Sequence, residues 1–389
     1  MPNKTELTLF FCSCLLISIQ AVNADHEGRE YDVYIGGRVK LDLVVNIDSS
    51  NNPITSSSDL SLSPGSISTQ GGSDTEVKFN GRESRLWATL VYPVAGDQFH
   101  GHIEYDFLES GADSFGTTKL NEKLRLRHLY VSYAGITAGR TFTTFYNSLS
   151  YPDINDGGGP PGVISVRQDL LRIEKTFNWG QILLSMENPE TTLLMNSGQS
   201  IASDNSDTPD VVGKIIVENE WGNWSLAAIV RKLKLDNLRV ARHIDEEWGG
   251  AINAAGRYFI TEQNNLRFSL TYGTAVGRYF SSNAFNDAVV DKAGKLHSTK
   301  IVGGYLAYQH WWTEKLRSLF VIGAGTADQH LSAALTKATK HYASSHINLR
   351  WSPSVQSIIG IEWIHAYRKL ENSHSGKLNR IQLTFDYKF

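Results

Sequence analysis

Apolar and polar residues alternate along most of the chain after residue 24. In the closing stretch "LNRIQLTFDYKF", Ile381, Leu383, Phe385, Tyr387 and Phe389 share one parity, and the residues between them are polar or charged. Side chains of a strand point alternately to its two faces, so this pattern predicts a strand with one apolar face. No convincing amphipathic helix interrupts the alternation, which recurs in residues 34–46, 98–110, 122–134, 169–177 and 265–277. The sequence therefore predicts an all-β protein.

The phase of the alternation breaks in the stretch "EVKFNGRESRLWATLVYP". Val77 has the opposite parity from Leu86 and Leu90, although all three are apolar. One extra residue reverses the facing of everything that follows it in a strand, so we expect a β-bulge near residues 83–85. The facings of residues 128–133 are ambiguous for the same reason.

Segment length and the placement of aromatic residues favour a transmembrane barrel over a soluble sandwich, which would alternate as well. Many segments run to about 10 to 15 residues, whereas ordinary strands have about five or six. Rings also gather near the segment ends, as they do at the two rims of a membrane barrel. They are Tyr31, Tyr34, Tyr92, Tyr133, Trp179, Trp221, Trp224, Trp248, Trp311, Trp312, Trp351 and Phe389.

The connections alternate between short and long. About seven short turns and about eight long loops join about 16 antiparallel strands, with both termini at the short-turn end, which is the pattern of periplasmic turns and external loops. Hydrocarbon offers the backbone no hydrogen-bond partner, so the sheet must close on itself. The final strand is then part of the wall, and Phe389 lies at the periplasmic rim.

The first 24 residues form a separate unit. An apolar run from Leu7 to Ile19 is followed by a small-residue cleavage pattern ending at Ala24, so residues 1–24 are expected to be a cleaved signal peptide. The run is shorter than the about 20 apolar residues that span a bilayer, which disfavours the alternative of an uncleaved anchor. Both cysteines of the chain lie in this unit. The barrel domain, residues 25–389, is therefore expected to hold no disulfide and no Cys zinc site.

The polar faces of the strands predict the chemistry of the lumen. The formal net charge of -3 and the absence of a basic run give no reason to expect a nucleic-acid partner. About 16 strands enclose more than side chains can fill, so a water-filled channel is expected, and inward arginines would focus a positive potential on small anions. The inward basic residues are Arg38, Lys40, Arg125, Arg127 and Arg172, with Arg82 or Arg85. In the alternative, each arginine serves only the wall, held by a carboxylate such as Asp42, Glu104, Asp106 or Glu174.

The stretch "TFTTFYNSLSYPDINDGGGPPGVISVR" contains the third long loop, residues 143–165. In general porins this loop folds into the lumen and narrows it. Asp153 and Asp156 would then face the arginines and create a transverse field across the constriction. The alternative is an external loop.

Other chemistry has weaker support. "DINDGGG" lacks the bidentate Glu of an EF-hand, and His100 with His102 lacks a third ligand, so no metal or cofactor is expected. G-x-S-x-G, P-loop and H-E-x-x-H motifs are absent, so no enzyme is expected. Two alternatives to a diffusion channel remain open. One is an outer-membrane hydrolase acting on lipid or peptide, and the other is a plugged barrel acting as an adhesin through residues 47–75 and 278–297.

Several short motifs resemble the DcaP-like family of trimeric outer-membrane porins. They are "GGRVKLDLVV", "GRESRL", "KLRLRHLYV", "AGRTFTTF", "LLRIEKTF" and "SMENPETT", in order along the chain. Members often carry an N-terminal coiled coil, which has no counterpart here. The resemblance implies a homotrimer of 16-stranded barrels in a Gram-negative outer membrane, among lipid and lipopolysaccharide, inserted through the strand that ends at Phe389. It implies passage of small anions such as dicarboxylates, and it assigns to the pore Arg38, Arg82, Arg85, Arg125, Arg127, Arg167 and Arg172.

Overall fold

The computed structural model describes residues 22–26, 29–49, 61–70, 74–110, 122–203, 206–235, 245–330 and 337–389. These residues form β-strands and four short 3-10 turns, namely Pro64–Ser66, Ser148–Ser150, Gly277–Tyr279 and Ser281–Asn283. In the described ranges, no helix is long and apolar enough to cross a membrane. Most of the predicted leader lies outside these ranges. Its end belongs to β1 (Val22–His26), which pairs with the beginning of the next strand, so cleavage after Ala24 stays a prediction.

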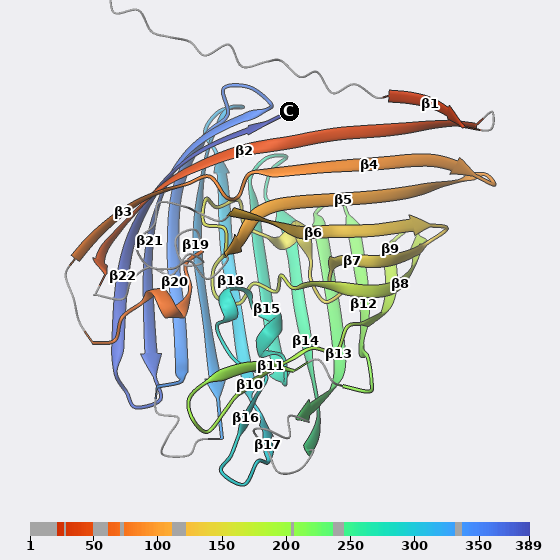
Figure 1. Cartoon of the computed structure of the whole chain (residues 1–389). Coiled ribbons are helices and arrows are strands. Elements are labelled where there is room, and N and C mark those ends of the chain that lie inside the picture. The colour runs from red at the N-terminus through yellow and green to blue at the C-terminus, as the bar shows by residue number, and fades with distance from the viewer. Residues whose placement is uncertain are drawn as a thin grey trace, which may run out of the picture.

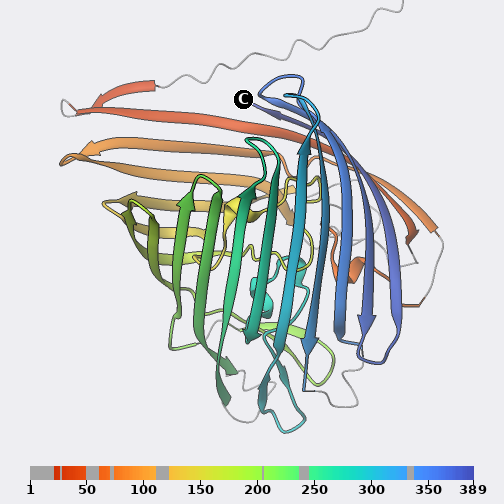
Figure 2. The same cartoon turned by 180° about the vertical axis from the view of Figure 1, so that it is seen from behind.

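The wall is one antiparallel sheet that closes on itself. Each strand pairs with the next, and the last pairs with β2. β3 and β4 both pair with β2 and form two halves of one stave, so the predicted barrel of 16 strands is confirmed, with β1 as one extra strand. Figures 1 and 2 show the wall running continuously from β2 to β22. The wall strands are β2 (Arg29–Ser49), β3 (Asp74–Asn80), β4 (Arg85–Val94), β5 (Asp97–Ser110), β6 (Glu122–Tyr133), β7 (Ile136–Phe142), β8 (Arg167–Phe177), β9 (Gly180–Glu187), β12 (Asp210–Asn219), β13 (Gly222–Leu235), β14 (Asp245–Phe259), β15 (Asn265–Thr274), β18 (Lys300–Trp311), β19 (Leu316–Asp328), β20 (Thr339–Trp351), β21 (Ser357–Leu370) and β22 (Ser375–Lys388).

The chain end closes the seam of the barrel. The backbone of Phe389 exchanges two hydrogen bonds of 3.0 Å with Gly37 of β2. Its ring packs over Gly37, where a side chain would overlap it. Because the pairing continues to the last residue, β22 leaves no unpaired edge at this end.

Burial along the wall is inverted relative to a soluble protein. Val39, Phe79 and Trp221 are 52%, 71% and 63% exposed, whereas Arg231 and Arg380 are fully buried. An apolar outer face around a polar interior is expected of a barrel surrounded by lipid.

Both predicted phase breaks have a structural cause. Between β3 and β4 the chain leaves the wall in a turn, residues 81–84, rather than the expected bulge. In β6, Glu104 pairs with His128 and Tyr105 pairs with Leu126, so Arg127 is the extra residue of a β-bulge. Arg127 and His128 are therefore both buried in the interior, although they are adjacent.

Two long loops form a second sheet that the alternation did not predict. Its strands are β10 (Thr191–Leu194), β11 (Ser200–Ser203), β16 (Ala288–Val290) and β17 (Leu296–Ser298). It covers the loop end of the barrel (Figure 1). Buried Arg231 supports it, with Asp210 at 3.2 Å and Asp287 at 3.0 Å. The connection predicted to be long at residues 371–376 is a turn of residues 371–374.

Candidate functional site

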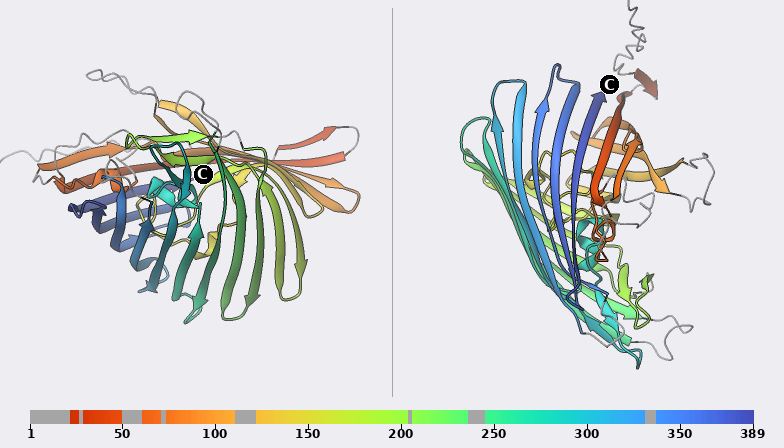
Figure 3. Two further views of the ribbon diagram at one scale, coloured as in Figure 1. Left: turned by 90° about the horizontal axis from the view of Figure 1, so that it is seen from below. Right: turned by 90° about the vertical axis from the view of Figure 1, so that its left-hand side faces the viewer.

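Residues 143–166, here called the third loop, cross the interior of the barrel. Lys214 Nζ of β12 donates to the Tyr146 carbonyl at 2.6 Å, and Arg267 Nη1 of β15 donates to the Tyr151 carbonyl at 2.5 Å. Farther along, Asn155 N donates to Glu362 of β21 at 2.6 Å. The loop thus lies along the inner face of the wall from β12 to β22. The views in Figure 3 show this segment within the barrel.

The two aspartates of the third loop bind the far wall and do not face the predicted arginines as a pair. Asp153 Oδ2 accepts from Arg317 Nε at 2.6 Å, and its other oxygen accepts from Arg350. Asp156 lies 3.5 Å from Arg380, and its Oδ1 accepts from the Leu62 amide at 2.8 Å. The expected transverse arrangement is therefore wrong for Asp153, because β19 and β20 supply its partners.

Glycines allow the loop to approach the wall closely. Gly162 has φ of +95°, which L side chains rarely adopt, and a Cβ there would overlap the Gly304 backbone. A Cβ on Gly323 would meet Pro160 and Pro161 at 2.7 to 2.8 Å. The glycine and prolines of the loop therefore pack directly against the glycines of β18 and β19.

A cavity of about 650 Å³ remains between the third loop and the wall from β2 to β8. Its lining holds seven basic side chains and three carboxylates, an excess of four positive groups. The basic residues are Arg38, Lys40, Arg85, Arg125, Arg127, Arg167 and Arg278, and the carboxylates are Glu83, Glu104 and Asp156.

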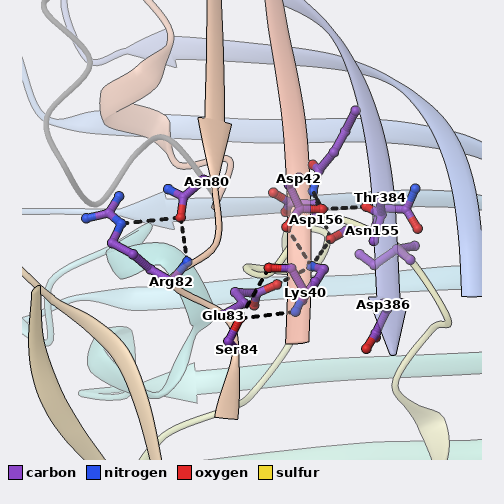
Figure 4. Close-up of polar contacts among 12 residues, drawn as sticks. Lys40, Asp42, Asn80, Arg82, Glu83, Ser84, Asn155, Asp156, Thr384 and Asp386 are labelled. Carbon is purple, nitrogen blue, oxygen red and sulfur yellow. Dashed lines mark hydrogen bonds and ion pairs between the residues drawn. The ribbon is translucent and has the colours of Figure 1, made fainter. Parts of the chain in front are cut away.

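Seven of the ten predicted pore residues line this cavity, and Arg82, Arg172 and Asp153 do not. Arg82 bends back within its own turn, where its amide and Nε contact Asn80 Oδ1 at 2.9 and 3.3 Å (Figure 4). Arg172 lies farther along β8 and is 3.8 Å from Glu174. The geometry therefore separates these three from the others.

The turn of residues 81–84 brings Glu83 into the lumen beside Lys40, one of the predicted residues (Figure 4). Glu83 bonds Lys40 Nζ and lies 3.8 Å from Arg38. Lys40 also lies 3.1 Å from Asp42, and its Nζ donates to the Asn155 carbonyl of the third loop at 2.9 Å. Lys40 therefore connects β2 to the third loop. Its charge is partly neutralised by these contacts and acts less on a solute.

Arg125 and Arg127 share one buried carboxylate, that of Asp106. Arg125 Nη2 lies 2.7 Å from Asp106, which also accepts from Arg127 Nη1 at 2.5 Å. Arg127 Nε donates to Glu104 at 2.5 Å, and Arg85 lies 3.5 Å from the same carboxylate. The wall carboxylates named as alternative partners are thus present, but arginines outnumber them.

Arg167 differs from its neighbours. Its guanidinium lies 4.9 Å from the centre of the Phe142 ring, and among the described residues no carboxylate is within ion-pair distance of it. Arg278, in the connection between β15 and β18, also lines the cavity and was missed. This residue lies outside the strands of the wall, so the alternation could not predict that it faces the cavity.

Asp156 is the lining group that titrates near neutral pH. Burial raises its pKa to about 6, against the opposing effect of Arg380 and His346. For Asp153, burial would raise the pKa, but Arg350 and Arg317 outweigh it and hold the pKa below its ordinary value. Within the described ranges, no cluster of three or more His, Cys, Asp or Glu could hold a metal ion.

Comparison with known proteins identifies the family and the fold. Residues 30–389 match the model of a family described as DcaP outer membrane protein. No curated protein matches the chain in sequence. The fold is similar to the outer membrane channel DcaP of Acinetobacter baumannii, with a TM-score of 0.78 and 20% identity over 94% of this chain and 99% of that one.

Two further solved structures share the fold. They are an anion-selective porin from Comamonas acidovorans (TM-score 0.56, 13% identity, 92% of this chain and 100% of that one) and the trimer form of OmpT from Vibrio cholerae (0.55, 8%, 92% and 99%). At such identities, these likenesses establish the barrel fold alone.

Proposed function

Because this chain belongs to the DcaP outer membrane protein family, and so forms a channel of the Gram-negative outer membrane, we propose that the channel favours small anions, dicarboxylates among them. The observation that carries this proposal is the excess of four basic groups in the cavity lining. A water-filled space with low-dielectric walls focuses that excess on a passing solute. The Comamonas porin, named as anion-selective, has the same fold.

Arginine suits carboxylate solutes in particular. Its planar fork of N–H donors matches a carboxylate in a bidentate manner. Arg167, which has no carboxylate partner among the described residues, can offer this fork to a solute without first breaking an ion pair. We infer that the carboxylate of a passing solute binds Arg167 and then moves to the N–H groups of Arg125 and Arg85 that their ion pairs leave free. The solved relatives are named as channels or porins, which favours permeation over the hydrolase alternative.

We further propose that the protein assembles as a homotrimer through the wall from β6 to β9. β7 has 7 residues and β9 has 8, compared with 14 in β22. A tilted strand of seven residues rises only about 18 Å, less than the about 25 Å apolar band of a membrane barrel. Arg140 and Asp169 face each other on the outside of β7 and β8, and within the described ranges neither forms an ion pair. Protein covers such a low, charged wall better than lipid does.

Insertion of the purified protein into a planar bilayer tests the channel. We expect stable conductance steps, and a KCl gradient across the same bilayer reports whether anions or cations carry the current. A hydrolase or a plugged adhesin would give no steady steps. A conducting but cation-preferring channel would reject the arginine assignment and leave the barrel intact.

Lowering the pH from about 7.5 to about 5 is expected to increase anion preference, because a carboxyl with a pKa of about 6 is anionic above that value and neutral below it. Arg380, His346, Glu362 and the Leu62 amide face Asp156. The measurement is the zero-current potential as a function of pH.

The matched variant for this prediction is Asp156→Asn, which keeps an oxygen acceptor for the Leu62 amide. Its anion preference should already be high at pH about 7.5 and should change less on acidification. The difference in pH response between the two proteins isolates the contribution of Asp156. An identical pH response in both would show that Asp156 does not set it.

A further inference from the structure

A groove of about 730 Å³ lies on the outer face of the wall from β15 to β21. Its floor is a row of small residues in register, Gly304, Ala324 and Ala343, on three adjacent strands. Leu270 and Tyr367 continue the same row and flank the floor on either side. Three strands of small residues make a depression about 14 Å wide. The lining is almost entirely apolar, as befits a surface in hydrocarbon.

Small residues also form the inner face of the wall behind the groove. A Cβ on Gly303 would overlap Phe280, and one on Gly325 would meet Phe285 at 2.9 Å, because the connection between β15 and β18 packs against the inner face. Gly162 of the third loop packs in the same way on Gly304. The two loops therefore pack directly on the wall backbone from inside, whereas the small outward-facing residues Gly304, Ala324 and Ala343 leave the outer face hollow.

Two lysines lie beside the groove at the extracellular end of the strands. Lys369 pairs in register with His341, and Lys377 with Tyr367, and both His341 and Tyr367 line the groove. Within the described part of the chain, neither lysine has a carboxylate at ion-pair distance. Their neighbour Lys340 is bound to Glu371 at 3.1 Å and adds no free charge.

We propose that this groove and the two lysines form a binding site for a phosphorylated lipid of the outer leaflet. One acyl chain lies in the groove over Ala324, and a phosphate of the headgroup lies between Lys369 and Lys377. Charge complementarity selects the lipid, since an anionic headgroup at the membrane surface gains about fivefold in affinity for each nearby lysine. The proposal rests on the placement of the barrel in the outer membrane and is independent of ion selectivity.

The position of the groove favours lipid over a second copy of the chain. Its central strand, β19, is the thirteenth stave counted from β2, and β7, at the centre of the low wall, is the fifth. Half the circumference of a 16-stave barrel separates them. A trimer assembled through β6 to β9 would therefore leave the groove facing the bilayer.

Native mass spectrometry of the full-length protein, purified and delipidated in detergent, tests the site with three probes. These are bisphosphorylated lipid A, dephosphorylated lipid A and phosphatidylethanolamine. The variants are Lys369→Gln with Lys377→Gln, and Ala324→Leu, which fills the groove. Lys292→Gln with Lys295→Gln removes the same charge from an exposed loop, and Ala228→Leu enlarges an exposed outer-face residue on β13.

We expect bisphosphorylated lipid A to bind about 30-fold more tightly to the wild type than to the double lysine variant. Dephosphorylated lipid A should show little of this difference, Ala324→Leu should weaken the binding of both forms, and the control variants should match the wild type. Equal binding of all three probes would overturn the proposal and indicate ordinary annular lipid. A change in the number of copies per particle in the lysine variant would also overturn it and assign the surface to assembly. Bilayer conductance of the same samples reports separately on the channel.

Discussion

Replacing Arg125 and Arg127 together with glutamine is expected to abolish the preference for anions, lowering the anion-to-cation permeability ratio about tenfold. The change removes two of the seven basic groups that line the cavity. It also leaves Asp106, which is fully buried between them, without an arginine partner. The lining then carries five basic groups against three carboxylates, and the uncompensated charge of Asp106 adds a fourth negative group beside them. Zero-current potentials in a KCl gradient measure the effect directly.

Two further variants show where the effect comes from. Lys292→Gln with Lys295→Gln removes two positive charges from an exposed loop and should leave the permeability ratio within about twofold of the wild type, because bulk salt screens charges beyond about 10 Å. Arg167→Gln removes the one lining arginine without a described carboxylate partner, so it should lower the ratio without exposing a buried carboxylate. If the Arg125 and Arg127 variant kept its anion preference, these two residues would serve the wall alone.

Replacing Asp153 with alanine is expected to release the third loop and raise the single-channel conductance. Asp153 neutralises both Arg317 and Arg350, which are buried inside the wall. Removing one member of a buried ion pair costs about 3 to 5 kcal/mol, because the other charge stays buried without compensation. The loop can relieve this cost by separating from β19 and β20, which admits water to both arginines and widens the water-filled cross-section on that side. We therefore expect noisier and larger current steps, together with a lower unfolding temperature in detergent.

Asp207→Ala is the matched control for the third loop. Asp207 also bonds a lysine, at 3.1 Å, but it lies in an exposed loop. Surface changes of this kind usually alter stability by less than about 0.5 kcal/mol. Asp153→Glu keeps the charge and should restore much of the wild-type conductance. Wild-type conductance and stability in Asp153→Ala would show that other contacts, such as those of Asn155, hold the loop without Asp153.

The alternation was sufficient to predict the wall, because lipid outside and water inside impose opposite polarity on successive residues. It correctly predicted that Arg38, Lys40, Arg125 and Arg127 face inward. The bulge in β6 explains why His128 faces inward as well. It could not predict what an inward side chain binds. Arg380 had inward parity from the start, but its role as the partner of Asp156 depends on the path of the third loop.

The remaining differences lie where periodicity ends. Arg82 was expected to join the lumen cluster, but a four-residue turn allows it to bond Asn80 instead. The second sheet consists of strands of three or four residues, which are too short to show a period of two. Arg278 belongs to the same connection as two of those strands, so only tertiary structure could bring it to the cavity.

The most direct measurement is the zero-current potential of a single wild-type channel in a planar bilayer that separates concentrated from dilute KCl at neutral pH. Seven basic groups against three carboxylates predict that chloride crosses more readily than potassium, so the sign of the potential should be that of an anion-permeable pore. A potential of the opposite sign would contradict the account, because it would mean that the lining arginines are neutralised by the wall and do not act on the solute.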